Sequence, residues 1–95
     1  MKPRISLQSK IGTPDDVLVQ KLQGESVLLN LKTGVYFGLD KTGTRIWNLL
    51  QERTTLQEVL TTMLEDYDVA EERCRMDLLE LVGKMEEQGL VTVSN

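Results

Sequence analysis

The spacing of apolar side chains changes once along this 95-residue chain, near Leu39, and this change limits the folds that the chain can adopt. Between Val17 and Leu39 apolar residues recur at every second position, which is typical of β-strands. After Leu39 they recur at every third or fourth position, which is typical of amphipathic helices. The apolar sets of the three predicted strands are Val17 and Val19, then Val27, Leu29 and Leu31, then Val35, Phe37 and Leu39.

The order of these elements predicts an α+β domain in which three strands precede three helices. Glycine-containing segments at 23–25 and 32–34 favour tight reversals, so the simplest sheet is a three-stranded antiparallel meander. We expect the helices to cover one face of this sheet and its two outer strands to remain edges unless an arm or a partner covers them. The first strand is the least regular, because Leu18 and Leu22 lie out of phase with Val17 and Val19.

Local signals predict where the helices begin and end. Asp40 or Thr42 can cap the first helix, and residues 55–58 form a capping box for the second. Residues 68–71 repeat that arrangement for the third helix, which we expect to end at Gly89. The predicted buried sides are Ile46, Trp47, Leu49 and Leu50, then Leu56, Val59, Leu60, Met63, Leu64 and Tyr67, then Cys74, Leu78, Leu81, Val82 and Met85.

The two ends of the chain carry weaker patterns. Residues 1–16 are predicted to be a flexible N-terminal arm, because Ile5, Leu7 and Ile11 are too widely spread to define one face. The alternative is that residues 5–7 dock as a short strand. The remainder, residues 17–95, is predicted to be one domain, in which residues 90–93 can add a short terminal strand.

Composition excludes several classes of protein. Eleven basic and fifteen acidic residues give a net charge of −4, the wrong sign for binding phosphates, so we expect no nucleic-acid partner. No segment approaches the roughly 20 apolar residues of a membrane-spanning helix, and the start of the chain lacks the apolar block of a secretion signal. The chain is therefore expected to be cytoplasmic, with no membrane contact.

The chain offers little for catalysis. It has no histidine, and its single cysteine, Cys74, lies on the apolar stripe of the third predicted helix, where a small core residue is expected. The carboxylates between 65 and 72 cross a helix end and indicate a solvated surface more than a cation site. We therefore predict no enzyme activity, no catalytic residue, no metal site and no cofactor.

Tyr36 is the aromatic residue that the core pattern does not account for. It lies in the phase opposite to Val35, Phe37 and Leu39, so it is expected to point away from the helices or toward a groove at the border of the sheet. Two interpretations stay open. Tyr36 is either a contact for a bound peptide or a cross-strand neighbour of a residue at 28 or 30.

The segment 28–50 carries a family resemblance. It reads Leu-Leu-Asn-Leu-Lys-Thr-Gly-Val-Tyr-Phe-Gly-Leu-Asp-Lys-Thr-Gly-Thr-Arg-Ile-Trp-Asn-Leu-Leu, and its most distinctive part is the run from Leu39 to Thr44 followed by Ile46 and Trp47. This segment resembles the PqqD-like family, the peptide chaperones of pyrroloquinoline quinone biosynthesis and the recognition elements of ribosomally made, post-translationally modified peptides, including lasso peptides. The resemblance extends over residues 17–93.

The resemblance implies a winged helix-turn-helix-like domain that binds the leader region of a precursor peptide and performs no chemistry. The leader is expected to add as an antiparallel strand beside the third strand, in a groove against the third helix. Its implied partners are separate maturation enzymes, either a radical SAM enzyme or a protease and a cyclase. The implied peptide-binding residues are Val35, Tyr36, Phe37 and Gly38 on the strand, with Arg73, Asp77, Leu78, Leu81 and Lys84 on the helix.

Two other functions compete with leader binding. A winged-helix transcription factor shares the fold, but the third predicted helix, residues 70–88, has six acidic and three basic side chains and would be repelled by DNA. A structural protein could use its open strand edge to pair with a second copy, which would make a homodimer. The sequence does not decide which flank of the third helix faces a peptide.

Overall fold

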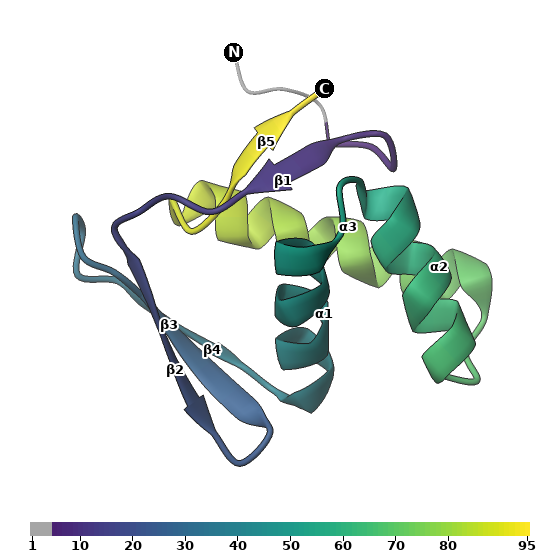
Figure 1. Ribbon diagram of the computed structural model, residues 1–95, viewed down its shortest axis with the longest axis horizontal. Coiled ribbons are helices and arrows are strands. Elements are labelled where there is room, and N and C mark those ends of the chain that lie inside the picture. The colour runs from purple at the N-terminus through teal and green to yellow at the C-terminus, as the bar shows by residue number, and fades with distance from the viewer. Residues whose placement is uncertain (1–4) are drawn as a thin grey trace.

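The computed structural model describes residues 5–95 and forms an α+β fold. Its elements, in chain order, are β1 (Lys10–Gly12), β2 (Val17–Leu22), β3 (Glu25–Asn30), β4 (Tyr36–Leu39), α1 (Lys41–Glu52), α2 (Leu56–Asp66), α3 (Glu71–Glu87) and β5 (Thr92–Ser94). In Figure 1 the sheet of β2, β3 and β4 lies at the lower left, the β1–β5 pair lies at the top, and the helices lie to the right. The predicted order of strands followed by three helices is confirmed.

The larger sheet is an antiparallel meander in the order β2-β3-β4, as the sequence predicts. The connection between β2 and β3 is a two-residue turn in which Gln23 and Gly24 have φ values of 48° and 88°. Positive φ at both positions matches the twist of the flanking strands, which makes this the favoured turn of a tight hairpin. The turn fixes the register that places Leu28 of β3 opposite both Val19 and Phe37.

The chain ahead of β2 is part of the fold over the residues that the structure describes. β1 pairs antiparallel with β5, with Ile11 opposite Val93, and both side chains pack against the core together with Ile5 and Leu7. Two amides at the start of α2 also donate to the carbonyl groups of Leu7 and Ser9. Over residues 5–16 the structure therefore differs from the predicted flexible arm, because this segment pairs with β5 and bonds to the start of α2. Residues 1–4 of that arm lie outside the described residues.

The first two helices begin where local signals predict. Asp40 caps α1, because its Oδ1 accepts a hydrogen bond from the N–H of Gly43 at 2.8 Å. Thr55 and Glu58 form the predicted capping box of α2, in which each side chain accepts from the other residue's backbone N–H. Each such cap typically contributes about 1 kcal/mol to helix stability.

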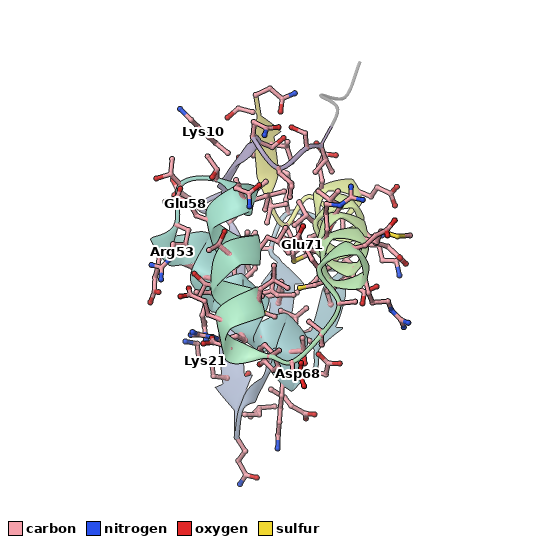
Figure 2. The ribbon with its side chains drawn as sticks, turned by 90° about the vertical axis from the view of Figure 1, so that its right-hand side faces the viewer. Lys10, Lys21, Arg53, Glu58, Asp68 and Glu71 are labelled. Carbon is pink, nitrogen blue, oxygen red and sulfur yellow. The ribbon has the colours of Figure 1, made fainter. Side chains whose placement is uncertain are left out.

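The predicted cap of the third helix is wrong. The residue that precedes α3 is Ala70, which makes no side-chain cap hydrogen bond. The chain between the helices is extended at Tyr67 and at Ala70, so Asp68 stays near the foot of α2, whereas Glu71 lies at the end of α3 that faces the viewer in Figure 2. In place of a cap, Glu71 and Glu72 put negative charge in the first turn, where the helix dipole favours it.

The core lies between the inner face of the larger sheet and the three helices. Trp47 of α1 and Leu60 of α2 are almost completely buried, and Leu78, Val82 and Met85 form the buried stripe of α3. Cys74 and Leu81, which were predicted to belong to that stripe, are half-buried at its edge. The buried sides that the sequence predicts for α1 and α2 are confirmed for Ile46, Trp47, Leu49, Leu50, Leu56, Val59, Leu60 and Met63.

The predicted phase of β3 is wrong. Leu28 is fully buried, whereas Val27 and Leu29 are half-buried on the opposite face. Ser26 shares the buried face with Leu28, and its hydroxyl bonds that of Thr44 on α1 at 2.8 Å. The pattern misleads because apolar residues stand on both faces of β3, and the register with its neighbours selects which face meets the helices.

The third helix ends where the sequence predicts, whereas Tyr67 at the end of α2 is more exposed than predicted. Gly89 follows α3 with a φ of 70°, the left-handed conformation in which helices commonly terminate, and the chain continues into β5. Tyr67, which was predicted to lie in the core, is 37% exposed because it sits at the extended C-cap of α2.

Candidate peptide-binding site

β4 is an edge strand of its sheet. It pairs with β3 on one side, and within residues 5–95 no strand pairs with its other side. The backbone N–H of Asn30 donates to the carbonyl of Val35 at 2.9 Å, and ladder hydrogen bonds in an antiparallel pair fall on alternate residues. Phe37 and Leu39 therefore bond to β3, whereas Tyr36 and Gly38 direct their N–H and C=O groups toward the open edge.

A groove runs beside this edge. It has a volume of about 430 Å³, and its walls are β4, the start of α1 and one side of α3. The residues that line this β4–α3 groove are Phe37, Gly38, Leu39, Asp40, Thr42, Gly43, Ile46, Asp77, Leu81 and Lys84. An extended chain that paired with the open edge would therefore place every second side chain in the groove.

The wall that α3 contributes follows a helical spacing. Asp77, Leu81 and Lys84 are four and three residues apart, so they share one side of the helix. Leu81 supplies an apolar surface between one acidic and one basic side chain. Lys84 also pairs with Glu80 at 3.1 Å on the exposed surface.

The groove continues into a smaller hollow of about 140 Å³ between the helices. Ile46 and Asp77 line both spaces, and Arg73 and Cys74 lie on the α3 side of the smaller one. Arg73 forms an ion pair with Asp77 at 3.6 Å, and both side chains are largely exposed. This ion pair lies where the two hollows meet, and an exposed pair of this kind contributes little to stability.

A buried asparagine fixes the two walls at the opposite end. Asn30 Nδ2 donates to the carbonyls of Gln88 and Gly89 at 2.9 and 3.3 Å, which ties the end of β3 to the end of α3. Its Oδ1 accepts from the N–H groups of Lys32 and Thr33 in the β3–β4 turn. One side chain thus joins the end of α3 to the turn that leads into β4.

The structure brings most of the predicted site residues together. Phe37, Gly38, Asp77, Leu81 and Lys84 share the groove, and Arg73 lies at its end. The flank of α3 that borders β4 is therefore the one that carries Asp77, Leu81 and Lys84. Val35, in contrast, lines a separate hollow near Asn30.

Two further predicted residues, in addition to Val35, do not line the groove. Leu78 is only 1% exposed, so it supports the groove from the core and does not line it. Tyr36 is 71% exposed and points to the face of the sheet that turns away from the helices. Its cross-strand neighbour is Leu29, not a residue at 28 or 30, because the register pairs even positions of β4 with odd positions of β3.

Sequence reasoning missed the contribution of α1. Thr42, Gly43 and Ile46 line the groove, and a Cβ at Gly43 would lie only 3.1 Å from the side chain of Leu39. The signal that could have found them was the segment that carries the family resemblance, which contains this glycine three residues after the cap at Asp40.

The thiol of Cys74 is the one sulfhydryl group beside the groove. Burial raises the pKa of the Cys74 thiol, and the nearby carboxylate of Asp77 raises it further, so the neutral thiol persists at neutral pH. Over residues 5–95, cysteine and carboxylate side chains do not gather into a group that could hold a metal ion. None of the helices in that part of the chain has the length and apolar character needed to cross a membrane.

The α+β fold, with its three-stranded antiparallel sheet followed by three helices, is the winged helix-turn-helix-like fold that the resemblance implies. The family model described as "Coenzyme PQQ synthesis protein D (PqqD)" matches residues 25–91, and the chain belongs to this family. A search of curated proteins finds no significant match.

Two solved structures are similar to this protein. The structure described as "TbiB1 in Complex with the TbiA(beta) Leader Peptide" is 34% identical, covers 84% of this chain and 93% of its own, and has a TM-score of 0.79. The structure described as "Lasso peptide synthetase B1 complexed with the leader peptide" is 22% identical, covers 86% of this chain and 96% of its own, and has a TM-score of 0.78. The second similarity shows that the fold is shared.

Proposed function

We propose that this protein captures the leader segment of a ribosomally made precursor peptide and presents it to separate maturation enzymes. The observation that carries this proposal is the open edge of β4, with the free backbone groups of Tyr36 and Gly38 beside the β4–α3 groove. Both similar structures are of complexes with leader peptides, and membership of the PqqD family supports the same role.

Capture has a backbone part and a side-chain part. The leader adds as an antiparallel strand whose main-chain groups bond those of Tyr36 and Gly38. Its alternate side chains enter the groove between Phe37 and Leu81, where apolar groups are buried. Because Asp77 and Lys84 flank Leu81, charged leader residues of either sign find a partner at the rim.

The protein acts as an adaptor and carries out no reaction itself. Its only thiol, Cys74, is kept protonated, and its sequence has no histidine to serve as a base. Chemical change is therefore assigned to separate enzymes, which we expect to be a protease and a cyclase of the lasso-peptide type, since one similar structure is of a lasso peptide synthetase B1. A radical SAM enzyme is the corresponding partner if the product is of the quinone type.

The test is a titration of the isotope-labelled protein with the TbiA(beta) leader peptide, followed by NMR. We expect binding at about micromolar concentration, with the largest amide shifts at Tyr36 and Gly38 and smaller shifts along the groove face of α3. Saturable binding that leaves every amide from Val35 to Leu39 unchanged would reject strand addition at β4.

Charge substitutions in the groove give an independent test. Replacing Asp77→Ala or Lys84→Ala should weaken leader binding several-fold, because each removes a rim charge, and should leave thermal stability unchanged because both side chains are exposed. The matched control is Met76→Gln, an exposed residue of α3 that does not line the groove. Equal affinities for all four proteins would place the peptide elsewhere.

A further inference from the structure

The sheet has a second face that the proposed site does not use. The outer face, as we call it, turns away from the helices and consists of three rows of cross-strand neighbours. Two rows reach β4, namely Leu18, Leu29 and Tyr36, and Gln20, Val27 and Gly38, and the third is the pair of Leu22 and Glu25 beside the β2–β3 turn. Neither of the two rows that reach β4 contains a charged residue, although 27% of the chain is charged. An uncharged and largely apolar surface that reaches an open strand edge marks a contact surface.

Gly38 leaves a gap in this face. A Cβ built at Gly38 has no neighbour within 4 Å among the residues that the structure describes, so the space above its backbone is open. Next to it is a hollow of about 320 Å³, whose lining includes Val27 and Tyr36 together with Leu18 and Leu29. The outer face is thus apolar on β2 and β3 and open at the position on β4 that a visiting strand would adjoin.

We propose that Gly38 opens a second subsite, on the outer face, which receives one large apolar or aromatic side chain of the bound leader. This inference rests on the proposed strand addition at β4. Gly38 is one of the two residues whose backbone groups point to the open edge, so a leader residue pairs with it directly. Residues that pair directly have side chains on the same face, which here is the outer face.

Cross-strand distances explain why the side chain should be large. The Cα of the leader residue opposite Gly38 lies about 10 Å from the Cα of Val27, because one hydrogen-bonded and one non-hydrogen-bonded pair separate them. A side chain of the size of leucine or larger can cross the bare backbone of Gly38 and meet Val27. Covering a strand glycine with an aromatic cross-strand partner is a known means of stabilising a sheet.

The protein therefore contacts leader side chains on both faces of the strand that the leader forms. Side chains of one phase enter the β4–α3 groove, and the side chain opposite Gly38 rests on the outer face. The second leader residue of that phase adjoins Tyr36, which is already large and 71% exposed and so leaves less room. Selectivity on the outer face is thus concentrated at one leader position.

The experiment measures binding of fluorescein-labelled TbiA(beta) leader peptide by fluorescence anisotropy. The variants are Gly38→Val, which fills the gap, and Val27→Thr, which makes the floor of the subsite polar at nearly constant volume. Val27 is paired with Gln20 and Gly38 and cannot contact the backbone of the leader, so its effect reports the side-chain subsite alone. The matched control is Leu22→Gln, an exposed apolar residue on the same face of β2 but outside the two rows that reach β4.

We expect Gly38→Val to weaken binding about fivefold and Val27→Thr about twofold, with no change for Leu22→Gln. Thermal stability should be retained in Gly38→Val, because Gly38 does not have a left-handed backbone and valine favours strands. Alanine substitution along the leader should identify one position that matters for the wild-type protein and no longer matters for Gly38→Val.

Three results would contradict the proposal in different ways. Wild-type protein that fails to bind the leader would contradict the proposed function and the subsite with it. Wild-type binding that both Gly38→Val and Val27→Thr leave unchanged would contradict the subsite alone. A concentration-dependent dimer of the wild-type protein that Gly38→Val abolishes would assign the outer face to a second copy of the chain.

Discussion

Replacing Gly89→Ala should destabilise the protein because two separate costs meet at this residue. Gly89 has a φ of 70°, and an alanine in this left-handed conformation costs about 1 kcal/mol. Its new Cβ would lie 2.7 Å from Asn30 Nδ2, the atom that ties the end of β3 to the end of α3. Displacing a buried amide from its hydrogen bonds costs a further 1–3 kcal/mol or so.

The sum is a loss of roughly 2–4 kcal/mol in the free energy of unfolding, measured by urea denaturation with an unchanged m-value. The matched control is Gly34→Ala. Gly34 has a similar φ of 77°, but in the described part of the chain no atom lies within 4 Å of a built Cβ, so only the conformational cost of about 1 kcal/mol should remain. If the loss at Gly89 did not exceed the loss at Gly34, the reasoning about Asn30 would be refuted.

Three further substitutions or treatments test local features. Gly83→Ala should raise the free energy of unfolding by about 1 kcal/mol, because a Cβ inside α3 meets only Ile5 Cδ1 at 3.8 Å, and a melting temperature that does not rise would contradict this. Thr55→Ala should lower it by about 1 kcal/mol through loss of the capping box with Glu58, whereas equal stability in urea would show that the cap contributes nothing. Cys74 should react with iodoacetamide only at a more alkaline pH than free cysteine, because burial raises the pKa of its thiol; a rate profile that matched free cysteine would show that the thiol is not shielded.

Signals that act over a few residues were readable from the sequence. Asp40 and the 55–58 capping box each sit one turn from the amide that they satisfy, so no tertiary information was needed to predict them. The capping prediction at Asp68 failed because the chain stays extended through Ala70, and the packing of α3 sets where that helix begins. A capping pattern shows only that a helix can begin at a position.

The inner face of β3 was not readable. Val27, Leu28 and Leu29 are all apolar, so the two-residue period does not distinguish the two faces of the strand. Register with β2 and β4 turns Leu28 to the core and leaves Val27 and Leu29 on the outer face. The polar residues Ser26 and Asn30 are buried because each finds a hydrogen-bond partner on another element, which a pattern of hydropathy does not reveal.

The candidate site was predicted in part. The family resemblance implied that the third strand and the third helix form the site, and the structure places Phe37, Gly38 and Asp77 along one groove. The resemblance placed Leu78 in the groove although its helical phase put it on the buried side, and the contribution of Ile46 emerged only once α1 was seen to form one wall of the groove. These assignments depend on how helices sit over the sheet, which is a property of the assembled domain.

The pairing of β1 with β5 has a practical consequence for anyone who wishes to tether this domain. Residues 10–12 and 92–94 lie side by side, and neither strand contributes a lining residue to the β4–α3 groove. A linker joined near either end would leave from the same corner of the molecule and leave the docking edge unobstructed. The domain is thus suited to fusion with a catalytic unit through whichever end is more convenient.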